Sequence, residues 1–196
     1  GCVWKLEKLC RNKALKAAVE KPENVKLFLN VDGNIIQDKA FIQGFTNRRA
    51  MKAGVPASDI VFEITERSDI ENYQILQQIM KHYADQGYEI ALDDVGAGHS
   101  GLNRVVNTTP DYLKADIELV RDIHKYKKKE IMMKLLLDYC NATGAILIAE
   151  GIETAQELEC LHSLGVHYGQ GFFLGKPERA FGNISAESEE ILERLN

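Results

Sequence analysis

Oxygen-bearing side chains stand at or near the ends of short apolar runs along much of the chain. They are Asn30, Glu63, the adjacent Asp93 and Asp94, and Glu150. No histidine or cysteine stands at these ends, and an all-oxygen ligand set suits Mg²⁺ or Mn²⁺ better than zinc. Crowded carboxylates also raise one another's pKa unless a cation lies between them. We therefore predict that these five residues hold divalent metal.

The adjacent Asp93 and Asp94 are suited to bridging two ions. Two metals about 4 Å apart are the usual arrangement for in-line attack on a phosphodiester, because together they activate a water and stabilise the leaving oxygen. Lys114 lies in another apolar run, where it can orient that water or balance the developing negative charge. The pattern predicts metal-assisted hydrolysis of a phosphodiester.

Each polar residue at or just after a strand end, taken alone, has a simpler interpretation. Asp116 or Glu153 by itself is most often a helix N-cap or a solvated loop residue. Asn30 and Gln170 are also common turn residues. An exposed turn is a weaker interpretation of the Asp93 and Asp94 pair, which directly follows Ile90, Ala91 and Leu92 and precedes glycines. Only the whole set of strand ends favours a metal site.

Short apolar runs alternate with amphipathic segments from one end of the chain to the other. Runs typical of buried parallel strands cover residues 25–30, 60–64, 89–93, 112–115, 145–150 and 167–173. Helical patterns cover residues 3–19, 71–86 and 127–141. The apolar faces that they predict consist, in turn, of Leu6, Leu9, Leu15 and Ala18, of Ile75, Ile79, Met80 and Tyr83, and of Ile131, Leu135 and Tyr139. This alternation implies parallel strands joined by right-handed crossovers.

Two α/β architectures fit such an alternation, a TIM-type (β/α)₈ barrel and an open doubly wound sheet. In a barrel the carboxyl ends of all strands face one mouth, whereas an open sheet spreads them along an edge. The polar strand ends therefore favour the barrel. A complete barrel typically needs about 250 residues, so we expect one that lacks at least its first βα unit. We assign residues 1–180 to the barrel domain and 181–196 to a C-terminal helical tail.

The composition narrows the class of protein. The 196 residues are 45% hydrophobic and carry a net charge of −5, which argues against a broad basic surface for DNA. No apolar run approaches the ~18 residues of a membrane span, and no signal peptide is visible at the start. We expect a cytoplasmic protein without direct membrane contact, whose four separated cysteines are buried free thiols.

A glycine pattern after Asp94 matches a dinucleotide-binding fingerprint, with glycines at 96, 98 and 101. Two aspartates immediately before it would repel a pyrophosphate, and Pro110 stops the following helix after barely two turns. We reject a nucleotide cofactor here. The segment 95–101 is instead predicted to be a loop beside the site.

At these residues the sequence resembles the EAL-domain family of metal-dependent cyclic di-GMP phosphodiesterases. The similar segments are LFLNV (27–31), FEITE (62–66), LDDVGAGHSGL (92–102), YLKAD (112–116), AEGIET (149–154) and GQGFFLGKP (169–177). Their order and spacing together are highly specific, and they cover nearly the whole chain.

The resemblance implies a role for each matching residue. Asn30, Glu63, Asp93, Asp94 and Glu150 would hold two Mg²⁺ or Mn²⁺ ions, with Glu150 also assisting as a base. The implied catalytic group further includes Lys114 beside the attacking water, Asp116 near it, Glu153 as a supporting acid and Glu66, which would steady the loop after Asp94. Gln170, Asp116 and Pro177 would contact the substrate.

The family also implies a biological setting. Its members open cyclic di-GMP to linear pGpG in bacterial second-messenger signalling, commonly form homodimers, and are fused to or regulated by sensor or GGDEF-type domains. We therefore expect a hydrolase with these partners.

Two departures from the family pattern keep an alternative open. Val95 and Ala97 replace an aromatic and a hydroxyl residue in the loop. The Glu-Ala-Leu signature is expected upstream of residue 1, so the chain alone would lack one metal ligand and is expected to be inactive as a fragment. The alternative function is a catalytically inactive cyclic di-GMP receptor or signalling module. A weaker third interpretation is an unrelated metal-dependent barrel hydrolase acting on another phosphoester.

Overall fold

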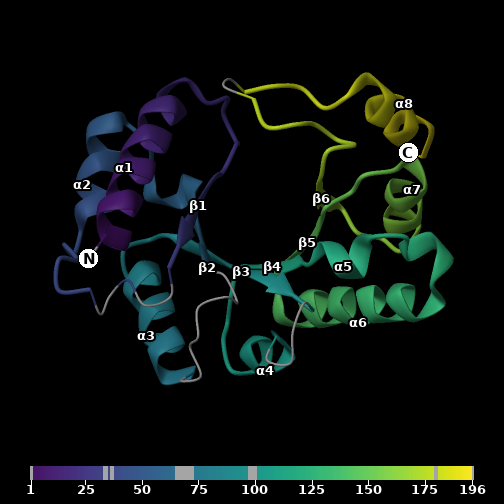
Figure 1. Ribbon diagram of the computed structural model, residues 1–196, viewed down its shortest axis with the longest axis horizontal. Helices are drawn as coiled ribbons and strands as arrows, with labels where there is room; N and C mark the ends of the chain where they lie inside the picture. Colours follow the sequence, from purple (N-terminus) through teal and green to yellow (C-terminus); the bar gives the residue numbers. More distant parts are fainter. Residues whose placement is uncertain are drawn as a thin grey trace. The chain divides into compact units, whose positions relative to one another are not determined.

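The computed structural model describes residues 2–32, 35, 38–64, 73–96, 101–178 and 181–195, and only the backbone of Cys2, Tyr73, Gly101 and Leu102. The chain divides into two compact units (Figure 1). The N-terminal unit comprises Gly1–Leu92 and Arg104–Pro110, and the C-terminal unit comprises Asp93–Asn103 and Asp111–Asn196. Strand β3 (Glu89–Val95) and helix α4 (Gly101–Val106) each contribute residues to both units.

The elements alternate between strands and helices in both units. The N-terminal unit contains α1 (Cys2–Ala17), η1 (Ala18–Glu20), β1 (Leu27–Val31), α2 (Phe45–Ala53), η3 (Ala57–Asp59), β2 (Ile60–Ile64) and α3 (Tyr73–Ala84). The C-terminal unit contains β4 (Tyr112–Ala115), α5 (Ile117–Val120), η4 (Ile123–Lys125), α6 (Lys127–Thr143), β5 (Ile146–Glu150), α7 (Ala155–Ser163), β6 (Tyr168–Gln170) and α8 (Ala186–Leu195).

The strands follow one another in the sheet in chain order, from β1 to β6. The registers of β1 with β2, β2 with β3, β4 with β5 and β5 with β6 are all parallel. A doubly wound sheet would place a later strand on the other side of the first, whereas a (β/α)₈ barrel keeps this sequential order. The prediction of an incomplete TIM-type barrel is confirmed, with six strands among the described residues.

Most strand bounds agree with the apolar runs. β2 and β4 have the predicted limits, and all residues of both are buried. β6 is much shorter than the predicted run 167–173 because the chain turns immediately after it. The amides of Leu174 and Gly175 both donate to the Gly171 carbonyl oxygen, at 3.1 and 3.0 Å, and close that turn.

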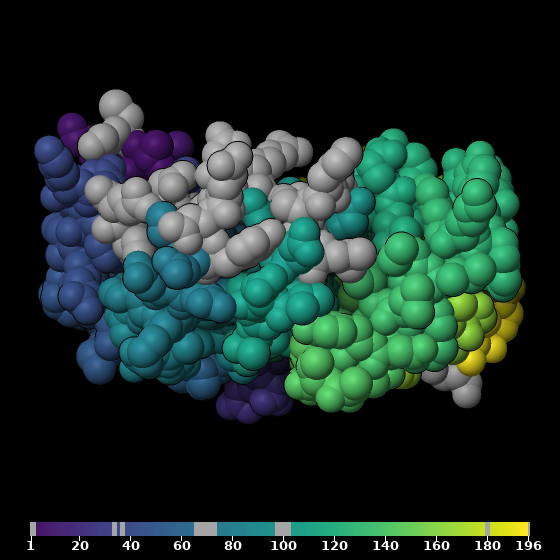
Figure 2. All heavy atoms as spheres, turned by 90° about the horizontal axis from the view of Figure 1, so that it is seen from below, coloured from purple at the N-terminus to yellow at the C-terminus, as the bar shows by residue number. Residues whose placement is uncertain are grey.

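The predicted apolar faces of two helices are wrong in part. In the first helical segment, Leu15 and Ala18 are buried as predicted, but Leu6 and Leu9 on α1 are 62% and 52% exposed. On α6, Ile131 and Leu135 are 53% and 58% exposed, and this helix lies in green on the surface seen in Figure 2. Each helix carries apolar side chains on more than one face, and periodicity alone does not reveal which of them the core covers. The buried face of α6 consists of Met133, Leu136, Leu137 and Cys140.

The buried face of α1 is built around a charged side chain, Arg11. Its guanidinium lies 5.4 Å from the Trp4 ring and 5.0 Å from the Phe62 ring. It donates to Thr46 Oγ1 at 3.1 Å and to the Tyr83 hydroxyl at 3.2 Å, and it forms an ion pair with Glu7. These contacts join α1 to α2, β2 and α3 within the N-terminal unit.

The cysteine side chains differ in how far they are buried. Cys140 is buried as expected, Cys160 is half-buried, and Cys10 is exposed, so the expectation of buried thiols is wrong for Cys10. Cys10 lies on the solvent side of α1, one residue before the buried Arg11. None of the helices in the described part of the chain combines the length and apolar character that crossing a membrane requires.

Candidate functional site

A buried lysine joins two carboxylates in the C-terminal unit. Lys114 Nζ lies 3.0 Å from Asp93 Oδ1 and 2.6 Å from Glu150 Oε1. Its side chain is only 4% exposed, and those of Asp93 and Glu150 are 13% and 14% exposed. An ion pair this far removed from water requires close geometry to offset the loss of hydration. The cluster is therefore a specifically built polar site in an apolar setting.

The parallel ladder explains why these side chains meet. Lys114 on β4 is the register partner of Ile148 on β5. Glu150 lies two residues beyond Ile148, and side chains two apart on a strand point to the same face. Lys114 and Glu150 thus share a face near the carboxyl ends of their strands. The amide of Asp116 donates to Val95 O at 3.1 Å, which ties the end of β4 to the end of β3.

The backbone turns at Asp94 in a way that helps this gathering. Neighbouring side chains on a regular strand point to opposite faces, so Asp93 and Asp94 would normally diverge. Asp94 has φ of 56°, in the left-handed region that non-glycine residues rarely adopt. One oxygen from each of Asp93, Asp94 and Glu150 lies within 4.8 Å of the others. The unusual φ accompanies the convergence of both aspartates on one point.

These three carboxylates fit a divalent cation. They supply hard oxygen ligands, none is fully exposed, and their mutual distances allow one ion to touch all of them. Burial raises the pKa of the Glu150 carboxyl to about 7, although Lys114 lowers it, and the Asp93 carboxylate adds to the rise. A bound cation would favour the ionised carboxylates that this crowding disfavours.

The other two predicted metal ligands lie in the N-terminal unit. Asn30 on β1 and Glu63 on β2 are direct register partners. Asn30 is exposed, while Glu63 is 7% exposed although it lies in an otherwise apolar strand. The two residues therefore stand side by side. Their participation in a metal site with the carboxylates of the C-terminal unit stays a prediction.

A cavity of about 350 Å³ opens in the C-terminal unit beside the loops after β4, β5 and β6. It is lined by Ile117, Gly151, Glu153, Gln170, Gly171, Phe172, Gly175, Lys176 and Pro177. The predicted site residues Glu153, Gln170 and Pro177 thus share one pocket. Gln170 is also the register partner of Glu150, so the strand pair β5 and β6 carries residues of both the pocket and the carboxylate cluster.

The loops after β5 and β6 each contain a glycine that is packed too tightly to be replaced by a larger residue. A Cβ at Gly151 would lie 2.3 Å from Ile117 Cγ1, and Gly151 has φ of +70°. A Cβ at Gly171 would lie 2.1 Å from the Ile152 carbonyl oxygen. Segments following β4, β5 and β6 are thereby held in direct contact around the pocket.

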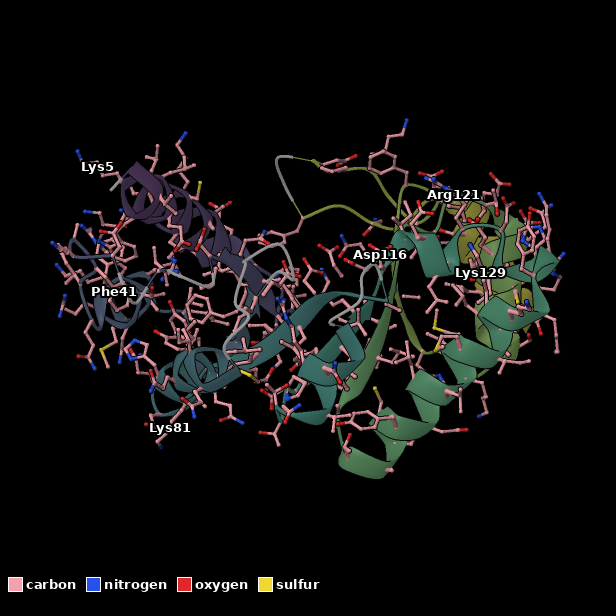
Figure 3. The ribbon with its side chains drawn as sticks, turned by 60° about the horizontal axis from the view of Figure 1, so that its bottom comes forward. Lys5, Phe41, Lys81, Asp116, Arg121 and Lys129 are labelled. Atoms are coloured by element: carbon pink, nitrogen blue, oxygen red, sulfur yellow. The ribbon has the colours of Figure 1, made fainter. Side chains whose placement is uncertain are left out.

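Asp116 has a structural role in this unit. Its carboxylate accepts from the Glu118 amide at 2.7 Å and caps α5, as expected of a lone aspartate after a strand. Figure 3 labels it at the start of that helix. Its assignment to catalysis and substrate contact stays a prediction. Glu66, predicted to steady the loop after Asp94, lies outside the described residues.

Three residues near the pocket were not singled out from the sequence. Phe172 and Lys176 line it directly, and both belong to the GQGFFLGKP segment. Glu157 lies behind the loop after β5, where it is 3% exposed and completes a capping box with Thr154. The Thr-x-x-Glu spacing of residues 154 and 157 is the sequence signal that predicts such a box.

Comparisons with known proteins show the family of the chain. The chain is 25% identical over 150 residues to cyclic di-GMP phosphodiesterase PdeB of Shewanella oneidensis, an alignment that covers 76% of the chain but 17% of that protein. The chain therefore spans about a sixth of the length of this relative.

Two solved structures superpose closely. The cyclic di-GMP-bound form of a standalone versatile EAL protein from Vibrio cholerae O395 has a TM-score of 0.85 and 28% identity, covering 94% of this chain and 78% of that one. The manganese and cyclic di-GMP complex of Klebsiella pneumoniae BlrP1 at pH 9.0 also has a TM-score of 0.85 and 28% identity, covering 92% and 47%. Residues 3–177 match the family described as the EAL domain. The chain belongs to the EAL domain family.

Proposed function

We propose that the protein carrying this chain hydrolyses one phosphodiester bond of cyclic di-GMP to give linear pGpG, with Mg²⁺ or Mn²⁺ as cofactor. The observation that carries the proposal is the cluster of Asp93, Asp94 and Glu150 around Lys114. Relatives named as cyclic di-GMP phosphodiesterases and neighbours crystallised with this nucleotide support the choice of substrate.

The residues would divide the work by position. Asp93, Asp94 and Glu150 would hold metal, together with Asn30 and Glu63 from the N-terminal unit. Two bound cations would supply an activated water and stabilisation of the leaving oxygen. Lys114 would balance charge that develops on the phosphate oxygens, since a buried cation acts strongly where little water competes. Glu150 would also accept a proton from the attacking water.

The pocket would receive the nucleotide beside this cluster. Gln170 offers an amide that can donate and accept hydrogen bonds, and Glu153 offers carboxylate acceptors for ring or exocyclic N–H groups. Phe172 is 60% exposed, and exposed aromatic rings are surfaces on which nucleobases stack. Pro177 contributes an apolar surface to the lining of the pocket. Asp116 and Glu66 complete the proposed site, and Glu66 would act on the loop after Asp94.

We propose three features of the whole protein on the same basis. It forms a homodimer, it is fused to or regulated by a sensor or GGDEF-type domain, and it acts in the cytoplasm, where a bacterial second messenger is degraded. Analytical ultracentrifugation of the protein carrying this chain tests the first. A purely monomeric species at working concentrations would overturn it.

The activity is tested by incubating the protein carrying this chain with cyclic di-GMP and either Mg²⁺ or Mn²⁺ and following linear pGpG. We expect metal-dependent product, reduced at least about a hundredfold in Glu150→Ala, with an unchanged circular dichroism spectrum. Glu159→Ala, which removes a half-buried carboxylate of α7 that pairs with Arg194, is the matched control and should keep wild-type turnover. Absence of product while metal and nucleotide bind would contradict hydrolysis and favour the receptor function.

A further inference from the structure

The carboxylate of Glu157 accepts hydrogen bonds from backbone amides of two separate connections. Its Oε2 accepts from the amides of Glu153 and Thr154 at 2.9 and 3.0 Å. Its Oε1 accepts from the amide of Asp122, 35 residues away in sequence, at 2.8 Å. Burial raises the pKa of this carboxyl, but the backbone N–H groups outweigh burial and leave the pKa below its ordinary value. The side chain is thus a buried, charged acceptor.

A helix cap accounts for only part of this arrangement. In a capping box the third helical residue accepts from the N-cap amide while the N-cap side chain accepts from the third residue's amide. Thr154 and Glu157 form both bonds, the second at 3.3 Å from Glu157 N to Thr154 Oγ1. The bonds to Asp122 and Glu153 lie outside the box, and they reach beyond α7.

The Asp122 end of this arrangement belongs to the connection after β4. Asp122 has φ of 56° and lies between α5 and η4. Lys129 Nζ donates to the carbonyl oxygen of Arg121 at 2.6 Å and to that of Glu118 at 2.5 Å, which fixes the same turn from the side of α6. Figure 3 shows Arg121 and Lys129 close together beyond the start of α5. This connection brings Ile117 to the pocket.

The other end belongs to the connection after β5, residues 151–154. Gly151 and Glu153 line the pocket, and Gly151 packs against Ile117 with no room for a side chain. The Glu157 carboxylate therefore accepts hydrogen bonds from both of the segments that meet at Ile117 and Gly151.

We propose that Glu157 is a positioning residue that fixes the connections after β4 and β5 and so shapes the pocket for the nucleotide. This inference rests on the proposed function and adds a determinant of substrate affinity. Lys114 and Glu150 lie on strands held by the β4–β5 ladder, so loss of Glu157 should disturb binding more than the chemical step.

The test is steady-state kinetics of cyclic di-GMP hydrolysis by variants of the protein carrying this chain. In Glu157→Ala we expect KM to rise roughly tenfold, because the free energy lost when buried donors lose their acceptor corresponds to such a factor, with kcat within about threefold. Glu157→Gln keeps one carbonyl acceptor for the capping box, but its NH₂ group cannot accept the hydrogen bond that the second carboxylate oxygen accepts from the Asp122 amide. Its KM should therefore also rise, though less than in Glu157→Ala.

Leu161→Ala is the matched control for a general loss of stability. Leu161 is 2% exposed on the same helix, and truncating it should lower the melting temperature through a cavity while leaving KM unchanged. An equal rise of KM in Leu161→Ala would overturn the proposal, as would an unchanged KM in Glu157→Ala.

Amide hydrogen exchange gives a readout that needs no turnover. In Glu157→Ala the amides of Asp122, Glu153 and Thr154 should exchange faster, while that of Glu118, which is held by Asp116, should not. Unchanged exchange at the first three amides would contradict the positioning role. If the wild type shows no hydrolysis, the proposed function fails, and this exchange measurement still decides whether Glu157 fixes the two segments.

Discussion

Arg11 in the N-terminal unit and Lys114 in the C-terminal unit are both buried beside carboxylates, and the two surroundings differ. Arg11 in the N-terminal unit is enclosed by aromatic rings and shares its ion pair with the single carboxylate of Glu7. Lys114 in the C-terminal unit contacts two carboxylates, Asp93 and Glu150, that also approach Asp94. The first arrangement neutralises its charge, and the second concentrates negative charge.

We interpret the Arg11 ion pair as structural and propose that the Lys114 cluster is functional. Arg11 donates to a hydroxyl on α2 and a hydroxyl on α3, so its bonds hold elements together. The bonds of Lys114 connect groups at the carboxyl ends of neighbouring strands, where barrel enzymes carry their chemistry. Excess carboxylate around a single lysine leaves a position that a divalent cation would stabilise.

The largest expected effect follows from removing the amine of Lys114. Lys114→Met keeps the length of the side chain but leaves Asp93 and Glu150 without their cation, and we expect turnover to fall by about 10²–10⁴-fold. The melting temperature should fall in the presence of a chelator and recover with Mn²⁺, because a metal ion can take over the missing charge. Turnover and thermal melting with and without Mn²⁺ check this; full activity would contradict the role of Lys114.

The matched change in the other unit is Arg11→Met. It leaves the Glu7 carboxylate buried without its cation, and breaking a buried pair in this way typically costs about 3–5 kcal/mol in the free energy of unfolding. Denaturant unfolding measures the loss. Mn²⁺ should not restore stability here, and a recovery equal to that of Lys114→Met would remove the distinction between the two regions.

A glycine pair tests how tightly the pocket side of the C-terminal unit is packed. Gly151→Ala introduces a Cβ 2.3 Å from Ile117, whereas Gly144→Ala at φ +80° meets nothing within 4 Å. We expect Gly144→Ala to cost about 1 kcal/mol through its left-handed backbone and Gly151→Ala to cost roughly 1–3 kcal/mol more through overpacking. Equal losses in the free energy of unfolding, measured with denaturant, would show that the loop accommodates the added Cβ by rearranging at little cost.

Two tyrosines near Arg11 give a contrast of similar size within the N-terminal unit. The Tyr83 hydroxyl accepts from Arg11 at 3.2 Å, while the buried Tyr88 hydroxyl has no hydrogen-bond partner among the described residues. Tyr83→Phe should cost about 1.5–3 kcal/mol, the usual value for a hydrogen bond to a charged group. Tyr88→Phe should stay within about 0.5 kcal/mol of wild type or gain stability. A larger loss from Tyr88→Phe would contradict this assignment of partners.

The sequence predicted the strands well and the helix faces poorly, for physical reasons. The run Ile60 to Ile64 is apolar apart from Glu63 because the strand is buried on both faces, so its limits are visible in composition alone. Helix α1 carries Leu6 and Leu9 on one side and Trp4 and Leu15 on another. Only tertiary packing selects the second side, where Arg11 pairs with Glu7.

The candidate site also contains some features that the sequence predicts and others that depend on tertiary packing. The carboxylates and Lys114 were visible as polar residues at strand ends, and the structure brings Asp93, Asp94 and Glu150 together. The hydrogen bond from the Asp122 amide to Glu157 cannot be predicted from the sequence, because it depends on how two distant connections approach each other. The capping of α5 by Asp116 is a local effect that residue type alone indicates.

The central claim is that the carboxylates around Lys114 bind a divalent cation. Isothermal titration of the protein carrying this chain with Mn²⁺, compared with its Asp93→Asn and Glu150→Gln variants, tests it directly. We predict saturable binding in the wild type and at least about tenfold weaker binding in both variants, since each replacement exchanges a charged oxygen ligand for a neutral amide. Equal Mn²⁺ affinity in all three proteins would contradict the claim.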